Sequence, residues 1–148
     1  MVTEQIADQE TSELRYEVRL LIRHPNIDPD RITETLGSTP HLSAMAGGVR
    51  KAPNGVILAG HHKFSVWSHC FDVEGNRLFF SDIGKMIDRL EPHKAFLAEI
   101  VDGGGSIELA VNLPGDINIG DSLSWRDLAR LSALQIDLGI EVFPDYNS

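Results

Sequence analysis

The sequence predicts an α+β fold of two layers, in which a mainly antiparallel sheet of about five strands carries helices on one face. Several segments alternate between apolar and polar residues, which is typical of strands with one buried and one solvated face. A parallel sheet buried on both faces would instead give continuous apolar runs. Between these segments lie stretches with apolar residues at helical spacing on one side only, which indicates helices that cover a single face.

Length and composition predict a globular protein. The chain has 148 residues, of which 42% are hydrophobic and 24% charged, and these values are typical of one ordinary domain. We expect residues 15–148 to form a single α+β domain. Residues 1–14 contain four acidic residues and no basic residue, and we expect them to form a mobile acidic tail.

Charge and targeting signals restrict the expected partners. The formal net charge of −9 opposes binding to nucleic acid, because such binding depends largely on clustered Lys and Arg. No apolar stretch approaches the roughly 20 residues of a membrane helix, and the N-terminus lacks the pattern of a secretory signal. The single cysteine, Cys70, cannot form an intramolecular disulfide. We therefore expect a cytoplasmic protein that binds neither nucleic acid nor membrane.

The first predicted elements are a strand and a capped helix. Residues 15–23 alternate between apolar and polar side chains, which predicts a half-buried strand. Asp28 can accept hydrogen bonds from the free amides at a helix start, and Pro29 suits the first helical position. Gly37 can adopt the left-handed conformation that ends a helix. A short helix is therefore expected between Asp28 and Gly37.

The middle of the chain predicts long loops followed by a strand. Residues 38–60 are rich in turn signals, and only residues 56–58 predict a short buried strand. Aromatic and β-branched residues predict a strand over 64–73, with Trp67 as its largest core candidate. Residues 74–76 should then turn the chain.

Two further helices are predicted before the clearest strand. Ser81 can cap a helix that carries four apolar residues at the i, i+3, i+4, i+7 spacing. These are Ile83, Met86, Ile87 and Leu90. Pro92 should kink or restart this helix, and the glycines at 103–105 should end it. Residues 106–113 then alternate strictly, which predicts a strand with one buried face.

The last predicted elements are a helix and a strand. Ser124 has the features of a helix cap, and three leucines supply the buried stripe of the helix. These are Leu128, Leu131 and Leu134. Gly139 should release the chain into a final strand over 140–143. The order strand, loop, capped helix thus occurs twice, at 15–37 and at 106–138, and the sequence leaves open whether this reflects duplication.

Several of these motifs together resemble the bacterial family known as domain of unknown function 4279. Its early Asp-Pro-x-x-Ile-Thr-x-x-Leu-Gly helix is matched by residues 28–37, and its mid-chain tryptophan by Trp67. The resemblance continues through Leu90-Glu91-Pro92 to the late leucine-rich helix and strand, and spans roughly residues 16–143. It implies no activity, because none is established for the family. In size and isolation the family is similar to some bacterial immunity proteins that neutralise a partner toxin, which is an analogy of fold alone.

Histidines in the middle of the chain are the candidate metal ligands. His61, His62 and His69 lie near Cys70, and imidazole and thiolate are the usual ligands of zinc. However, adjacent histidines on an extended segment point to opposite faces, and His61 and His69 would lie about 26 Å apart at ~3.3 Å per residue. This geometry favours exposed loop histidines and a buried thiol. No motif of a catalytic nucleophile is present, so we expect no catalytic residue and no cofactor.

The two tryptophans are the candidate partner-binding residues. Trp67 and Trp125 could anchor another protein, because aromatic residues are enriched at binding hot spots, although core packing is the preferred interpretation for both. Our leading hypothesis is a non-enzymatic protein-binding or accessory domain whose acidic surface contacts another protein. The alternative is a small metal-dependent hydrolase that uses the loop histidines. A third hypothesis is a self-associating structural domain.

Overall fold

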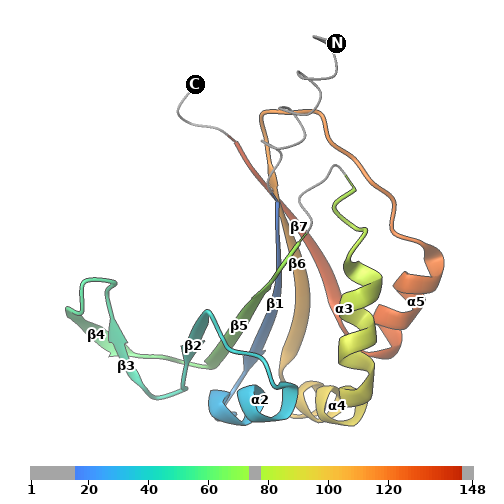
Figure 1. Ribbon diagram of the computed structural model, residues 1–148. Coiled ribbons are helices and arrows are strands. Elements are labelled where there is room, and N and C mark those ends of the chain that lie inside the picture. The colour runs from blue at the N-terminus through green and yellow to red at the C-terminus, as the bar shows by residue number, and fades with distance from the viewer. Residues whose placement is uncertain (1–15, 74–77, 145–148) are drawn as a thin grey trace.

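The computed structural model of the chain describes residues 16–73 and 78–144 (Figure 1). The predicted acidic tail at 1–14 and the predicted turn at 74–76 lie outside these residues.

Within the described residues, one five-stranded sheet forms the centre of the molecule, with the strand order β2-β5-β1-β6-β7. The strands are β1 (Glu17–His24), β2 (Leu42–Ala44), β5 (Ser65–Phe71), β6 (Ser106–Pro114) and β7 (Asp137–Phe143). Every neighbouring pair is antiparallel except β6 and β7, which are parallel. The predicted α+β class is confirmed.

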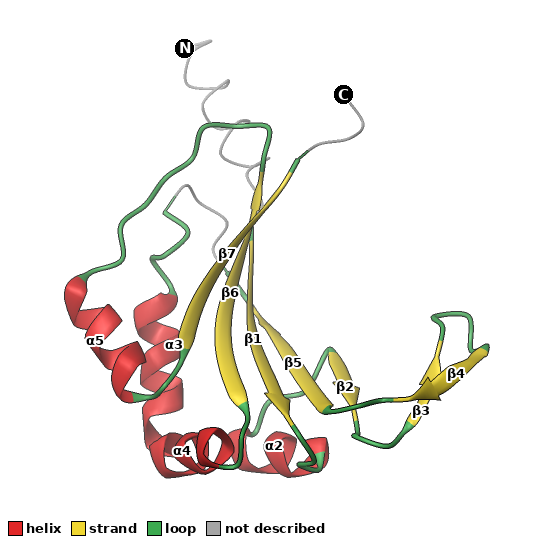
Figure 2. Ribbon diagram, turned by 180° about the vertical axis from the view of Figure 1, so that it is seen from behind, coloured by secondary structure: helices red, strands yellow, loops and turns green. Residues whose placement is uncertain are grey.

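The helices lie on one side of the sheet, and its other face carries no helix in the part of the chain that is described (Figure 2). The helices are α2 (Pro29–Leu36), α3 (Ile83–Leu90), the 3-10 turn η1 (Glu91–His93), α4 (Lys94–Asp102) and α5 (Trp125–Ala133). As predicted, Pro92 marks the change from α3 to α4, and Gly103 ends α4. None of the helices in the described ranges is long and apolar enough to cross a membrane.

The core fills the space between this sheet and the helices. On β1, the residues Val18, Leu20 and Ile22 are at most 1% exposed. The register places Ile22 between Trp67 of β5 and Ile107 of β6, so that alternate residues of three strands share the buried face. The alternation seen in the sequence therefore follows directly from one-sided burial.

Helix α2 begins and ends as predicted. Asp28 Oδ1 accepts a hydrogen bond from the backbone N–H of Asp30 at 2.9 Å, and Pro29 is the first helical residue. Gly37 closes the helix with φ at 68°. Trp67 is fully buried, and its Nε1 donates to Thr33 Oγ1 at 2.9 Å. This bond fixes α2 against β5, and the core interpretation of Trp67 is confirmed.

Residues 38–60 contain more strand than predicted. Besides β2, two short strands, β3 (Val49–Lys51) and β4 (Ile57–His61), pair antiparallel as a separate sheet. We call residues 49–61 the arm, which projects away from the body (Figure 1). The predicted buried strand at 56–58 is wrong in its burial, because every residue of β4 is exposed. A hairpin exposed on both faces leaves no alternation of apolar and polar residues, so β3 was missed and β4 was recognised only at its start.

The cap of α3 differs from the prediction. The helix begins at Ile83, with Asp82 rather than Ser81 at the N-cap position. The reason is a turn before the helix, in which the N–H of Ser81 bonds the carbonyl of Leu78 at 2.9 Å. Ser81 therefore belongs to the turn, and the helix starts two residues later.

The C-terminal segment also ends its helix earlier than expected. Ser124 caps α5 as predicted, with Ser124 Oγ accepting from the N–H of Asp127 at 3.2 Å. The chain reverses at Gln135, whose φ is +59°, and β7 already begins at Asp137. Gly139 therefore lies inside β7. A Cβ at Gly139 would lie 2.8 Å from Glu108 Cδ, so the glycine makes room for the neighbouring carboxylate.

Candidate functional site

Strand β7 forms one edge of the central sheet. Its inner neighbour is β6, and no strand in residues 16–73 or 78–144 pairs with its outer side. An unpaired strand edge exposes backbone donors and acceptors, which makes it a template for binding another chain. Helix α5 leads directly into this strand, so the two elements together form the surface at this side of the molecule (Figure 2).

The two faces of β7 differ in chemistry. Leu138, Ile140 and Val142 pair with buried residues of β6 and therefore point to the helix side. Ile140 and Val142 are nevertheless 54% and 56% exposed. The alternate residues Asp137 and Glu141 point to the open face and are exposed. An edge strand thus presents apolar side chains on one face and carboxylates on the other.

Helix α5 adds two apolar side chains to this surface. Trp125 is 71% exposed and Leu128 is 48% exposed, so the predicted core positions of both residues are wrong. The helix packs through its C-terminal half instead, where Leu131 is buried, as is Leu134 directly after it. The guanidinium carbon of Arg126 lies 4.9 Å from the centre of the Trp125 ring. Trp125 is therefore available to a partner.

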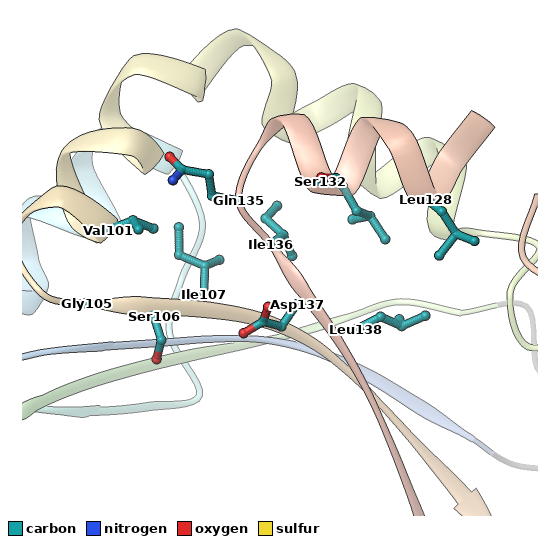
Figure 3. Close-up of a pocket in the computed structure, with 11 residues that line it drawn as sticks. Val101, Gly105, Ser106, Ile107, Leu128, Ser132, Gln135, Ile136, Asp137 and Leu138 are labelled. Atoms are coloured by element: carbon teal, nitrogen blue, oxygen red, sulfur yellow. The ribbon is translucent and has the colours of Figure 1, made fainter. Parts of the chain in front are cut away.

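A pocket joins the helix to the strand. It has a volume of about 500 Å³. Val101 and Ile107 lie at one end of it, and Leu128 and Leu138 at the other (Figure 3). The polar residues Ser132, Gln135 and Asp137 also line it. We call Trp125, Leu128, Leu138, Ile140 and Val142, with this pocket, the α5–β7 flank. The residues of the flank form one continuous surface. Trp125 and Leu128 are one helical turn apart, Leu128 and Leu138 both line the pocket, and Ile140 follows Leu138 on the same face of β7.

Carboxylates accompany the flank on the open face of the sheet. Glu108 of β6 lies beside Asp137 in the register, and its side chain passes over Gly139. Glu141 follows two residues beyond Gly139 on the same face. Three acidic groups therefore follow the edge of the sheet, and this arrangement favours a positively charged partner over a negatively charged one.

The candidate metal ligands lie on separate elements. His61 ends β4 in the arm, His62 follows it, and His69 lies in β5 of the central sheet. His69 packs between Trp67 and Phe71, and its Nδ1 lies 2.7 Å from the carbonyl oxygen of Thr39. In the described part of the chain, no group of three or more His, Cys, Asp or Glu side chains is placed to hold a metal ion.

Cys70 has a structural environment that the sequence did not reveal. Its Sγ donates to Glu17 Oε1 at 2.8 Å, and Arg19 donates to the same oxygen at 3.1 Å. Burial, followed by the Glu17 carboxylate, raises the pKa of the Cys70 thiol. The hydrogen bond from Cys70, followed by that from Arg19, lowers the pKa of Glu17. The thiol therefore stays protonated near neutral pH, a state unsuited to nucleophilic attack.

A second cavity lies beside this cluster. It measures about 610 Å³, and Glu17, Arg19 and Asn112 are among the residues that line it. Because Glu17 is already engaged by Cys70 and Arg19, its charge is balanced within the fold. Arg19 Nε is buried there without a hydrogen-bond partner among the described residues, whereas the guanidinium as a whole is paired with Glu17.

Comparison with known proteins places the chain in a family. The family described as domain of unknown function (DUF4279) matches residues 12–143. The chain belongs to the DUF4279 family. The resemblance inferred from the sequence motifs is thus confirmed. No curated protein and no solved structure matches the chain.

The DUF4279 match includes every part of the candidate site. It ends at Phe143, which is also the last residue of β7, so the pocket, the exposed edge and the arm all belong to the DUF4279 domain. Sequence reasoning missed this site because it assigned Leu128 to the core and started the last strand at residue 140. The alternation of Leu138, Ile140 and Val142 was the available signal for a longer strand.

Proposed function

We propose that this DUF4279 protein is a non-enzymatic accessory protein of the bacterial cytoplasm that binds another protein through the α5–β7 flank. The observation that carries the proposal is the exposure of Trp125 and Leu128 on α5 and of Ile140 and Val142 on β7, two elements joined by a pocket that Leu128 and Leu138 line. Contiguous exposed apolar side chains mark interaction surfaces, and aromatic residues are enriched among binding hot spots. An immunity-like role, the neutralisation of a partner toxin, would be one form of this function.

The chemistry of the flank also describes its partner. Asp137, Glu141 and Glu108 line the open side of the same edge. A partner with apolar side chains flanked by Lys or Arg would satisfy both faces of β7, since charge complementarity guides association and selects among partners. We therefore expect a basic protein surface to bind here.

Site-specific photo-cross-linking tests the proposal. A benzophenone amino acid in place of Trp125 should give one discrete cross-linked product in the source cells. The same amino acid at Glu34, which is exposed on α2, should give none. With the cross-linked protein identified and purified, Trp125→Ala should weaken its binding at least about 10-fold, equivalent to ~1.4 kcal/mol. Equal labelling at both positions, or unchanged binding by Trp125→Ala, would contradict the proposal.

The alternative function, a metal-dependent hydrolase that uses His61, His62 and His69, predicts a different result. Protein purified without a tag should then contain stoichiometric zinc that His61→Ala abolishes. On the protein-binding proposal, the metal content of the two proteins is equal and substoichiometric. Elemental analysis of both preparations therefore distinguishes the two functions.

A further inference from the structure

The arm is a second exposed apolar element, separate from the flank. Its two strands pair only with each other, and every residue of β3 and β4 is exposed. Ile57 is 69% exposed, and Val49, Val56 and Leu58 are exposed as well. An isolated two-stranded hairpin is only marginally stable in water. The arm therefore gains stability from any surface that covers these side chains.

The charge of the arm is opposite to that of the rest of the protein. The chain contains 22 acidic residues, yet none lies between Glu34 and Asp72. That interval contains Arg50, Lys51 and Lys63. Two of these cations, Arg50 and Lys51, lie on β3 and are exposed. A surface that covers the arm must therefore be both apolar and acidic.

The edge of the sheet at β7 has both of these properties, one on each face of the strand. The flank exposes Trp125, Leu128 and Ile140 on the helix side, while Asp137 and Glu141 lie on the open face of the same edge strand. Arg126 is also exposed and lies over the ring of Trp125, so the acidic side chains belong to the open side of the edge. The arm and the flank lie at opposite ends of the sheet order, with the arm beyond the β2 side and the flank at β7 (Figures 1 and 2). An arm therefore reaches a flank most directly on a second molecule.

We propose that the arm of one copy docks on the α5–β7 flank of a second copy, so that the DUF4279 chain associates head to tail. This inference rests on the proposed function, because it uses the same flank and names a second copy as its partner. The docked arm would lie along the outer edge of β7. Ile57 and its neighbours would cover Trp125, Leu128 and Ile140 on the helix side, while Arg50 and Lys51 would reach Asp137 and Glu141 on the open face.

Charge argues against the symmetric alternatives. Two flanks in contact would bring Asp137 and Glu141 of both copies together, and two arms in contact would bring together Arg50 and Lys51 of both. Like charges across an interface are unfavourable. The arm-to-flank contact avoids both arrangements. Because it joins two different surfaces, its repetition gives a closed ring or an open assembly with one arm and one flank free at the ends.

Sedimentation velocity of two complementary variants tests this arrangement. The first variant has residues 49–61 replaced by an Asn-Gly turn and keeps its flank. The second is Ile140→Lys, which keeps its arm but places a cation where the cationic arm would dock. Ala95→Lys, an exposed position on α4, adds the same charge outside the flank and serves as the control.

We expect the wild type and Ala95→Lys to associate with increasing concentration from about 10 μM to 1 mM. The association should weaken at least about 10-fold between ~0.05 and 0.5 M NaCl, because salt screens the charge pairs. Each of the two other variants should sediment as a monomer alone. Their equimolar mixture should form a 1:1 heterodimer, because it contains one intact arm and one intact flank that match.

Three outcomes would overturn the inference: a monomeric wild type over the whole range, unchanged association of Ile140→Lys, or no heterodimer in the mixture. A monomeric wild type that binds phosphatidylglycerol vesicles through its arm would assign the arm to a membrane surface instead, and would equally overturn it. The proposed function is judged separately by the cross-link at Trp125. A cross-link to a different protein with a monomeric wild type would reject the second copy and keep the function.

Discussion

At the scale of single residues, the fold depends on polar contacts that were only partly visible in the sequence. The cap of α2 could be predicted because Asp28, Pro29 and Gly37 act within one short segment, where local chemistry determines position. The bond between Cys70 and Glu17 could not, because these residues are 53 positions apart and meet only through the pairing of β1 with β5.

The N-cap gives the first stability prediction. Asp28→Ala removes the acceptor of the Asp30 N–H, and we expect a loss of about 0.5–2 kcal/mol in the free energy of unfolding. Asp28→Asn keeps a side-chain acceptor and should lose much less. Urea denaturation of the three proteins measures the difference, and equal stability of Asp28→Ala and wild type would show that the cap contributes nothing.

Glu17 gives a prediction about acid stability. Its hydrogen bonds with Cys70 and Arg19 lower its pKa in the folded state. The stabilisation is therefore present above the ordinary glutamate pKa and is lost as pH falls through the lowered value. Glu17→Gln should lose less stability than the wild type between about pH 5 and pH 3. Melting temperatures across this range measure the effect, which solvent screening limits to at most about 1 kcal/mol. Parallel pH profiles would contradict the assignment.

At the scale of elements, close contacts between segments orient the helices and decide which substitutions the junctions between elements tolerate. Arg130 of α5 forms ion pairs with Asp88 of α3 and, at 2.6 Å, with Glu91 of η1, which orients α5 along the other helices. The packing of α5 through its C-terminal half leaves Leu128 and Trp125 outside the core. The stripe of leucines predicted the helix but could not show which of them the sheet would cover.

The junction between α4 and β6 provides the prediction at this scale. A Cβ at Gly105 would lie 2.7 Å from the carbonyl oxygen of Arg23 and 2.8 Å from that of Ile100. Because both neighbours are backbone atoms, Gly105→Ala should cost about 1–3 kcal/mol. Gly120→Ala is the matched control, since nothing lies within 4 Å of its added methyl. Chemical denaturation compares them, and equal stability of the two variants would mean that the junction can relax.

At the scale of the whole molecule, the body and the arm differ in how they are held together. The body has a continuous core, in which Trp67 is fully buried. Two backbone hydrogen bonds hold the base of the arm, where it joins the body. The N–H of Gly47 donates to the carbonyl oxygen of His62 at 2.7 Å, and the N–H of His62 donates to the carbonyl oxygen of Gly48 at 2.9 Å. The arm contributes no residue to the core cluster.

We therefore expect the body to fold without the arm. Replacement of residues 49–61 by an Asn-Gly turn between Gly48 and His62 should leave a cooperative thermal transition within about 4 °C of the wild type. Trp67→Ala, by contrast, should cost about 3–5 kcal/mol. Circular dichroism melts of the two variants measure both effects. Loss of cooperative unfolding in the shortened chain would show that the arm is part of the core structure.

The sequence predicted the body far better than the candidate site. The alternation in β1 and β6 and the stripe of α3 reflect one-sided burial, so these elements could be recognised without knowing the fold. The flank and the arm expose their apolar residues, and a burial pattern cannot reveal a surface that is left uncovered. The repeated order of strand and capped helix was also ambiguous, because α5 leads to a parallel neighbour of β6 whereas β5 is antiparallel to β1.

The separation of the arm from the core has a consequence for how the protein can evolve. Substitutions in residues 49–61 leave the packing of the body unchanged, so they carry little penalty in folding. Charge and shape at the tip of the arm can therefore change, and with them the surface offered to a partner, while the scaffold beneath stays the same.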